Sequence, residues 1–317
     1  MTAQRGHVAA TTNRDLLGVH SLDHFVLAVP NLKMAQDYFS NFGLDVRERG
    51  DALLLKTFGS DQVWGVVVEG PRKRLRHISF GCFADDLPRF KARLESNGVK
   101  LLDAPAGFAS NGVWFRDPSD ILLELKVAPK SSTDRKMGGN WESSPEGVAG
   151  ASIRSKAPLA RPRRMSHMLA FTNDIDKAID FYSANLGLRL SDRASMVGFM
   201  HAIHGSDHHI LAFVQSAGPG LHHSSWDMAR IDDIGLAAMH MADQGHRKGW
   251  GLGRHVLGSN YFHYIQDPWG SFTEYTCDID YIAADQRWQA GHHADEDSFY
   301  LWGPNPPEDF VVNHEAG

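Results

Sequence analysis

The chain has 317 residues, of which 42% are hydrophobic and 22% charged, and its formal net charge is -6. This is the balance of a globular protein long enough for two domains, and the negative charge gives no reason to expect nucleic acid as a partner. No apolar run approaches the roughly 20 residues that span a bilayer, and two cysteines imply no disulfide framework, so we expect a cytoplasmic protein without membrane contact.

A repeated pattern follows an N-terminal extension of residues 1–19. An apolar, strand-like run contains His24, and Asp37 follows it by thirteen positions in a stretch with helical spacing. His167 and Asp180 repeat this spacing in the second half of the chain. In both copies a glycine-leucine pair comes next, which predicts the end of the helix before another strand.

A second pair of matching segments carries a histidine and, later, a glutamate. The motif Leu-x-His occurs at His77 and at His223, and each copy precedes a predicted helix, at residues 86–97 and 231–244. Each copy closes with a strand, an Asp-Pro turn and another strand. A glutamate lies seven residues after the aspartate of both turns: Glu124 and Glu274.

These segments predict an α+β fold of four βαβββ modules, paired into two domains that each form a curved mixed sheet around a central cavity. We expect the domains at residues 20–128 and 164–282. Residues 129–163 are rich in Ser, Gly, Pro and basic residues and predict a linker. The aromatic and proline-rich residues 283–317 predict a tail that packs as a covering arm.

The repeat also predicts a metal site in the second half. The chain has 18 histidines, and histidine is the commonest metal ligand. If each strand turns its ligand to the concave face, His167, His223 and Glu274 converge. Two imidazoles and one carboxylate on one side of a metal leave the opposite positions open, as in non-haem Fe(II) oxygenases. A lone histidine on a strand is more often a packed residue, but three ligand types recurring at matched places favour a metal site.

On these residues the chain resembles the vicinal oxygen chelate superfamily and, within it, the two-domain type I extradiol dioxygenases, over about residues 20–282. The most specific part is a Gly-Arg-His motif ending at His255, followed by Tyr264 after nine residues and by Glu274 after ten more. His209, fourteen residues before His223, resembles the family's catalytic histidine.

The resemblance implies extradiol cleavage of a substituted catechol by O2 at a mononuclear Fe(II) site, with Mn(II) less favoured. The product would be a ring-opened semialdehyde or keto acid, formed in aromatic-compound catabolism. His209 is the implied acid/base residue, while His255 and Tyr264 would bind a catechol hydroxyl oxygen. The family commonly forms symmetric homo-oligomers, so we expect one here.

Adjacent histidines leave an ambiguity at two of these positions. Strand alternation sends neighbouring side chains to opposite faces, so only one of His208 and His209, and one of His222 and His223, should face the metal. The family spacing favours His209, and the repeat favours His223.

The first half retains a matching set of ligands, His24, His77 and Glu124, but not the residues expected around them. Three residues stand in the places of His209, Tyr264 and His255: Val63, Trp114 and Pro105. A metal there would have no acid/base partner. Members of the family carry a non-catalytic N-terminal domain, so we expect this site to be vestigial.

Two other functions stay open within the superfamily: a glyoxalase-like isomerase or lyase, and a resistance-type protein that binds an aromatic ligand. The identity of the substrate also stays open. Trp250 stands where one branch of the family has an arginine for a substrate carboxylate, although Arg247 and Arg254 lie close by. Four aromatic residues could shape a pocket or belong to the core: Trp226, Trp250, Phe262 and Trp302.

Overall fold

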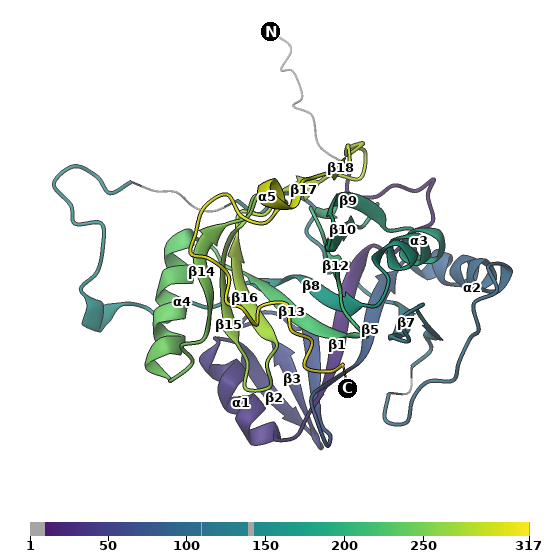
Figure 1. The fold of residues 1–317 in the computed structure, drawn as a ribbon, viewed down its shortest axis with the longest axis horizontal. Helices are drawn as coiled ribbons and strands as arrows, with labels where there is room; N and C mark the ends of the chain where they lie inside the picture. Colours follow the sequence, from purple (N-terminus) through teal and green to yellow (C-terminus); the bar gives the residue numbers. More distant parts are fainter. Residues whose placement is uncertain (1–9, 109, 139–142, 317) are drawn as a thin grey trace, which may run out of the picture.

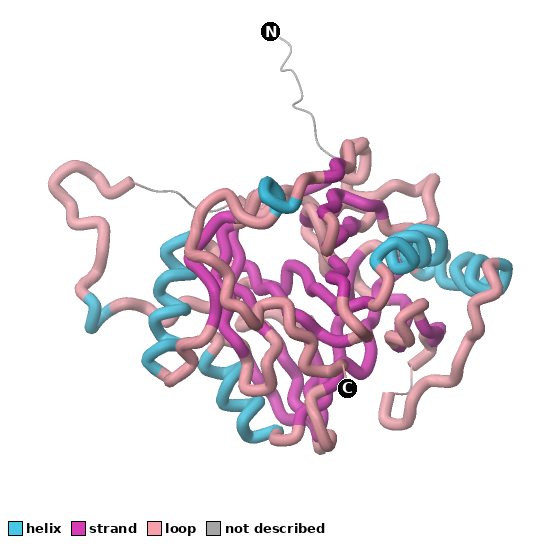
Figure 2. The backbone as a smooth tube through the Cα atoms, in the orientation of Figure 1, coloured by secondary structure: helices cyan, strands magenta, loops and turns pink. Residues whose placement is uncertain are grey.

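The computed structural model describes residues 10–108, 110–138 and 143–316 (Figure 1). Residues 1–9 of the expected extension, 139–142 of the expected linker and the last residue of the tail lie outside the described residues. Strands fill the middle of the molecule, and the longer helices lie at its sides (Figure 2). None of the described helices is long and apolar enough to cross a membrane.

The N-terminal half, residues 20–128, builds a seven-stranded mixed sheet in the order β2-β3-β4-β1-β5-β7-β6. Its elements are β1 (Ser21–Val29), α1 (Leu32–Asn41), β2 (Asp45–Arg49), β3 (Ala52–Lys56), β4 (Val63–Glu69), β5 (Arg74–Cys82), η1 (Ala84–Asp86), α2 (Leu87–Ser96), β6 (Val113–Arg116) and β7 (Leu122–Val127).

The C-terminal half, residues 164–282, builds a nine-stranded sheet with the order β14-β15-β16-β13-β8-β12-β10-β9-β18, whose last strand comes from the tail. Two short strands, β11 and β17, pair separately. The elements after β7 are η2 (Arg154–Lys156), β8 (Arg164–Thr172), α3 (Ile175–Leu186), β9 (Arg189–Ala194), β10 (Val197–His201), β11 (Ser206–Asp207), β12 (Leu211–Gln215), β13 (Gly220–Asp227), α4 (Ile231–Asp243), β14 (Gly249–Arg254), β15 (Tyr261–Gln266), β16 (Phe272–Cys277), β17 (Tyr281–Ile282), β18 (Gly291–His292) and α5 (Asp295–Ser298).

The α+β class predicted from the repeat is confirmed, with two open mixed sheets. One module departs from the pattern. Among its described residues, the second module of the N-terminal half has no counterpart of β14, and the isolated bridge between Leu102 and Trp114 marks the corresponding place. Pro105 follows this bridge, and proline cannot donate a backbone hydrogen bond to a neighbouring strand.

Side-chain caps and a glycine define the ends of the repeated helices. The side chain of Asn31 accepts a hydrogen bond from the backbone N–H of Met34 at the start of α1, and Asp174 accepts one from Lys177 at the start of α3. Such caps satisfy N–H groups that have no partner within the helix. Gly187 ends α3 with φ 71°, a left-handed conformation that glycine adopts without steric cost.

The first helix of each half packs against the Asp-Pro turn region of the other half. The Tyr38 hydroxyl on α1 donates to the carbonyl of Ile265 (3.1 Å), and the Phe42 and Tyr275 rings stack at 3.9 Å. In the mirrored contact, the Tyr182 hydroxyl on α3 donates to the Asp117 carboxylate (3.1 Å). The largest cluster of buried apolar side chains accordingly contains residues of both halves.

The tail after β17 crosses the C-terminal half, where it is drawn in yellow (Figure 1). Its strand β18 pairs with β9, and the backbone of Trp302 accepts a hydrogen bond from the N–H of Arg254. Glu315 is anchored at the far end: its buried carboxylate lies 2.7 Å from the Lys73 amine and accepts the N–H of Leu221. The tail is therefore held at both ends against the sheet that carries the predicted site.

Candidate metal centre and active site

Three neighbouring strands bring His167, His223 and Glu274 together, as the repeat predicted they could. His167 on β8 lies opposite Ser225 on β13, and Ser225 lies opposite Glu274 on β16. His223 precedes Ser225 by two residues and therefore points to the same face of the sheet. The Nε2 atoms of His167 and His223 lie 3.2 and 3.6 Å from the Glu274 Oε2 atom, and all three side chains are buried. We call these three residues the C-terminal cluster.

The donor atoms of this cluster suit a divalent metal ion. Among the described residues, neither the Nε2 of His223 nor the Oε2 of Glu274 has a hydrogen-bond partner. Buried polar atoms are nearly always paired, so two unpaired ligand atoms facing one point call for an occupant. Burial keeps the pKa of His223 well below its ordinary value, so the ring is neutral and can offer a lone pair.

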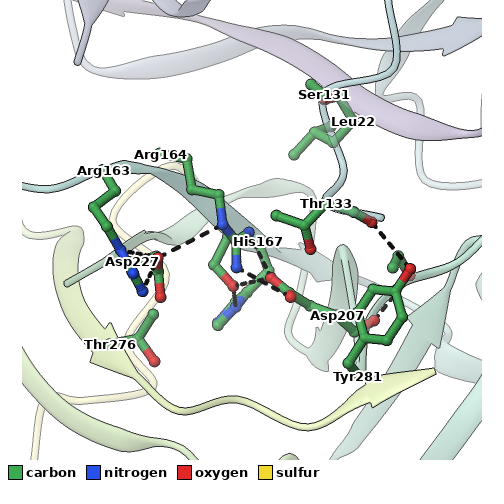
Figure 3. A network of polar contacts seen from close by, with 12 residues as sticks. Leu22, Ser131, Thr133, Arg163, Arg164, His167, Asp207, Asp227, Thr276 and Tyr281 are labelled. Carbon is green, nitrogen blue, oxygen red and sulfur yellow. Dashed lines mark hydrogen bonds and ion pairs between the residues drawn. The ribbon is translucent and has the colours of Figure 1, made fainter. Parts of the chain in front are cut away.

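A buried polar network orients His167 from behind (Figure 3). The Ser166 hydroxyl lies 3.2 Å from the His167 Nδ1 atom and donates to Asp207 (2.7 Å). Asp207 in turn accepts two hydrogen bonds from the buried guanidinium of Arg164, at 2.7 and 3.1 Å. Such outer contacts fix the ring orientation of a metal-binding histidine and leave its other nitrogen for the metal.

Of His222 and His223, only His223 belongs to the C-terminal cluster, although both rings line the cavity. The register of β13 against β8 shifts between Leu221 and His223, so His222 is the extra residue of a bulge. A bulge interrupts the alternation of side chains. The His222 ring consequently also reaches the cavity wall, where it packs on Phe310 with ring centroids 4.9 Å apart, and its Nδ1 atom lies 2.7 Å from the Nδ1 of His223.

His209 lies beside the C-terminal cluster, with its ring centroid 4.0 Å from that of His167. Its Nδ1 atom is 3.0 Å from the Nδ1 of His208, whose Nε2 lies 2.8 Å from an Asp192 oxygen. Burial raises the pKa of Asp192, but hydrogen bonds from His208 and His293 outweigh burial, so its pKa lies below the ordinary value. With the His208 Nε2 directed to Asp192, the His208 Nδ1 can accept the Nδ1–H of His209, which leaves the His209 Nε2 free to take up a proton.

His255 and Tyr264 form a hydrogen-bonded pair on the other side of the cluster. The Nε2 of His255 lies 3.0 Å from the Tyr264 hydroxyl, and its Nδ1 donates to the backbone carbonyl of Phe299 (2.8 Å). Burial raises the pKa of Tyr264 well above its ordinary value, and the charge of Glu274 adds to this effect. The tyrosine therefore stays protonated and donates, while His255 accepts.

Comparisons with known proteins agree with this geometry. Residues 164–275 match the Glyoxalase/Bleomycin resistance protein/Dioxygenase superfamily. The chain is 46% identical over 316 residues to metapyrocatechase 2 of Cupriavidus necator, covering 99% of this chain and 98% of that protein. The chain belongs to the extradiol dioxygenases of the vicinal oxygen chelate superfamily. The resemblance inferred from the sequence motifs is thus confirmed.

Two solved structures share the fold of this extradiol family member. A variant of homoprotocatechuate 2,3-dioxygenase from B. fuscum has a TM-score of 0.75 at 18% identity, covering 98% of this chain and 84% of that one. The Mn(II)-bound glyoxalase from Novosphingobium aromaticivorans has a TM-score of 0.74 at 22% identity, covering 93% of this chain and 94% of that chain. At these identities the likeness concerns the fold alone.

The C-terminal cluster of this extradiol family member opens into a cavity of about 330 Å³. Its wall is mostly apolar, and sequence reasoning missed the residues that form it, among them Met196, Phe199, Leu257, Phe299 and Phe310. None of the four aromatic residues singled out from the sequence lines this cavity as far as the structure describes the chain. Trp226 belongs to the core, Trp250 and Phe262 pack behind His255, and Trp302 is exposed.

Sequence reasoning also missed a role for Asn260. Its amide nitrogen donates to the Glu274 Oε1 atom (3.2 Å) and to the Thr276 hydroxyl (2.7 Å), so it holds the carboxylate of the cluster in place. Asn260 lies fourteen residues before Glu274. The corresponding residue of the N-terminal half is Ser110, and comparing the two halves at this spacing could have found it.

Proposed function

We propose that the chain catalyses extradiol cleavage of a substituted catechol by O2 at one divalent metal ion bound by His167, His223 and Glu274. One observation carries this proposal: two buried imidazoles and a carboxylate converge beside one cavity that also holds His209 and the His255–Tyr264 pair. The full-length relative is named metapyrocatechase, which supports the same reaction. Catalysis belongs to residues 164–282, whereas residues 20–128 form a non-catalytic domain.

Fe(II) is the proposed metal and Mn(II) the alternative. Both suit two imidazoles and one carboxylate. When bound, the metal supplies positions where the catechol oxygens and O2 can meet, together with electron transfer toward O2. Iron is favoured because the reaction depends on that transfer, while a protein of similar fold is Mn(II)-bound.

The chain's own residues hold the substrate and move its protons. The Tyr264 hydroxyl and the His255 Nε2 both border the cavity, so Tyr264 can hydrogen-bond a catechol oxygen and His255 can accept its proton. His209 stands beside His167, with Nε2 available to take up a proton and later return it to the opening ring. The apolar wall and the tail exclude water from this exchange.

The cavity favours an uncharged, apolar substituent on the ring. No lysine or arginine is among the described residues that line it, and its one acidic residue is Asp295. Arg254, one of the two arginines close to Trp250 in the sequence, is directed to the carbonyl of Ser259 (2.9 Å) and the Tyr261 ring instead. A carboxylated catechol would therefore bury an unpaired charge.

The decisive experiment is anaerobic reconstitution with Fe(II), followed by addition of catechol, alkyl- and aryl-substituted catechols and a carboxylated catechol in air. We expect yellow ring-opened products, formed with higher kcat/KM from the apolar substrates than from the carboxylated one. Glu274→Gln and His223→Ala should each lower bound iron and abolish turnover, whereas Glu95→Gln on the exposed face of α2 should change neither.

Turnover that survives loss of iron, or stoichiometric iron without ring opening of any catechol, would overturn the proposal in favour of a glyoxalase-like isomerase or a binding protein. A cytoplasmic location and a homo-oligomeric state are further parts of the proposal. Both described cysteines are free and buried, which agrees with a reducing compartment. Light scattering on the purified protein tests the oligomer.

A further inference from the structure

A second group of potential metal ligands lies in the N-terminal half. His24 on β1, His77 on β5 and Glu124 on β7 place ligand atoms within 4.8 Å of one another. We call them the N-terminal cluster. The sequence alone predicts a vestigial site here, because the acid/base residues of the other half have no counterparts. Missing acid/base residues prevent catalysis, however, and do not prevent metal binding.

The backbone frame of this cluster matches that of the C-terminal cluster residue for residue. His24 lies opposite Ser79, and Ser79 lies opposite Glu124, as His167, Ser225 and Glu274 do in the other sheet. The imidazole rings agree as well. The His24 and His77 centroids are 5.6 Å apart at 79°, and those of His167 and His223 are 5.6 Å apart at 77°.

Hydrogen-bonding groups behind the N-terminal cluster orient its ligands. His24 Nδ1 lies 2.6 Å from a carboxylate oxygen of Asp23, the contact that commonly orients a metal-binding histidine and leaves its Nε2 free. Glu124 is held by two hydroxyl donors, Ser79 and Ser110. Ser110 occupies the place of Asn260, fourteen residues before the glutamate.

The inner face of this cluster has an unpaired atom. His77 is 1% exposed, and its Nε2 has no hydrogen-bond partner among the described residues. Trp114 and Phe108 close around this ring edge-on, with centroids 4.8 and 4.9 Å away. The same kind of atom, the Nε2 of His223, is unpaired in the C-terminal cluster.

The surroundings leave an ion a path to the cluster. His24 borders a cavity of about 530 Å³ that is lined in part by charged residues, so an ion can enter from that side. The nearby Lys126 amine is paired with Asp23 at 3.1 Å. The Asp23 carboxylate thus offsets the Lys126 amine, and Glu124 offers a carboxylate to the ion.

We propose that the N-terminal cluster is a second metal site, in which His24, His77 and Glu124 bind a divalent transition ion such as Zn(II), Co(II) or Mn(II). The ion links β1, β5 and β7. It has no part in ring cleavage, because Val63 and Trp114 stand where an acid/base histidine and a tyrosine would be needed. The proposal is independent of the reaction assigned to the other cluster.

The test is a metal count on the full-length chain. Metal-free protein is titrated with Co(II), and bound cobalt is measured by calorimetry and by its visible absorption bands. We expect two ions per chain for the wild type, one for Glu274→Gln, one for His24→Ala and none for the double variant. His24 borders the cavity, so His24→Ala should fold normally, and the near-isosteric Glu124→Gln serves as a second, independent variant. His292→Ala, an exposed histidine outside both clusters, should retain two ions.

The count separates the two sites. One ion in the wild type, lost in Glu274→Gln and kept in His24→Ala, overturns the N-terminal site and keeps the metal centre of the proposed reaction. One ion lost in His24→Ala and kept in Glu274→Gln supports the N-terminal site and overturns the other. A second ion that survives both His24→Ala and Glu124→Gln is bound elsewhere and also overturns the proposal.

Discussion

The two clusters of this chain differ in their surroundings far more than in their ligands. Both present two histidines and a glutamate from three adjacent strands in one register, with matching ring geometry. Beside the C-terminal cluster stand His209, His255 and Tyr264. Beside the N-terminal cluster, Val63 and Trp114 take two of these places. The repeated sheet therefore accounts for three converging ligands, whereas reactivity depends on what is added around them.

Two of the three added residues come from segments that the two halves do not share. His209 lies just before β12, next to the short pair β11 and β17, and His255 directly follows β14. The N-terminal half has no counterpart of β14 among its described residues. The tail contributes Phe299, whose carbonyl fixes the His255 ring, and Phe310, which closes the cavity wall. Irregular and terminal segments thus position His209 and His255, whereas the paired modules position the ligands and Tyr264.

The largest effect should come from removing the proposed acid/base residue. His209→Asn keeps a polar side chain beside His167 but cannot take up a proton. We expect kcat to fall by about 10²- to 10⁴-fold, the usual contribution of general acid/base catalysis, with bound iron unchanged. Steady-state kinetics with a substituted catechol and metal analysis of the same sample measure both.

The matched control lies at the equivalent place of the N-terminal half. Val63→Ala should leave kcat within about twofold of the wild type, since this position has no proton to transfer. A His209→Asn variant that retained more than a tenth of the wild-type kcat would show that the acid/base residue lies elsewhere, and the contrast between the two halves would then rest on other groups.

A smaller effect is expected from the tyrosine that Trp114 replaces in the N-terminal half. Tyr264→Phe removes the hydroxyl that pairs with His255 Nε2. We expect kcat/KM to fall by about 10- to 100-fold, which corresponds to the loss of one hydrogen bond to a charged group. Tyr261→Phe, three residues earlier on the same strand and outside the cavity wall, should have no such effect. Equal losses in both variants would point to damage to the strand and would remove the proposed role.

The ligands could be predicted from the sequence because they lie on regular strands of a repeated module. Spacing alone placed His167, His223 and Glu274 on one face, since a strand alternates its side chains and the repeat fixed the register. The α+β class followed from the same repeat. The limits of the two helices predicted after His77 and His223 were also found to within one residue at either end.

The cavity wall could not be predicted because it depends on contacts between distant segments. Met196 and Phe310 are more than a hundred residues apart, and no periodicity links them. The bulge at His222 interrupts the alternation of side chains on β13, because one extra residue shifts the register locally. The sequence left open whether Trp250 lines the pocket or belongs to the core; the structure buries it behind His255, where its indole N–H donates to the Pro304 carbonyl of the tail.

The smallest effect concerns the two equivalent Asp-Pro turns. Burial raises the pKa of Asp117 and of Asp267 to about 6. Unfolded aspartate has its pKa near 4, so between about pH 4 and pH 6 the folded chain holds a proton that the unfolded chain has lost. The contribution of each group to the free energy of unfolding therefore falls by up to about 2–3 kcal/mol as the pH rises through this range. In urea unfolding of the metal-free protein, we expect the stability of Asp117→Asn relative to wild type to increase as the pH rises from 5.0 to 7.5. Asp267→Asn should gain less stability relative to wild type over this range, because it removes a charge that faces Lys73. Equal pH profiles for wild type and Asp117→Asn would show that the buried carboxyl is already ionised at pH 5.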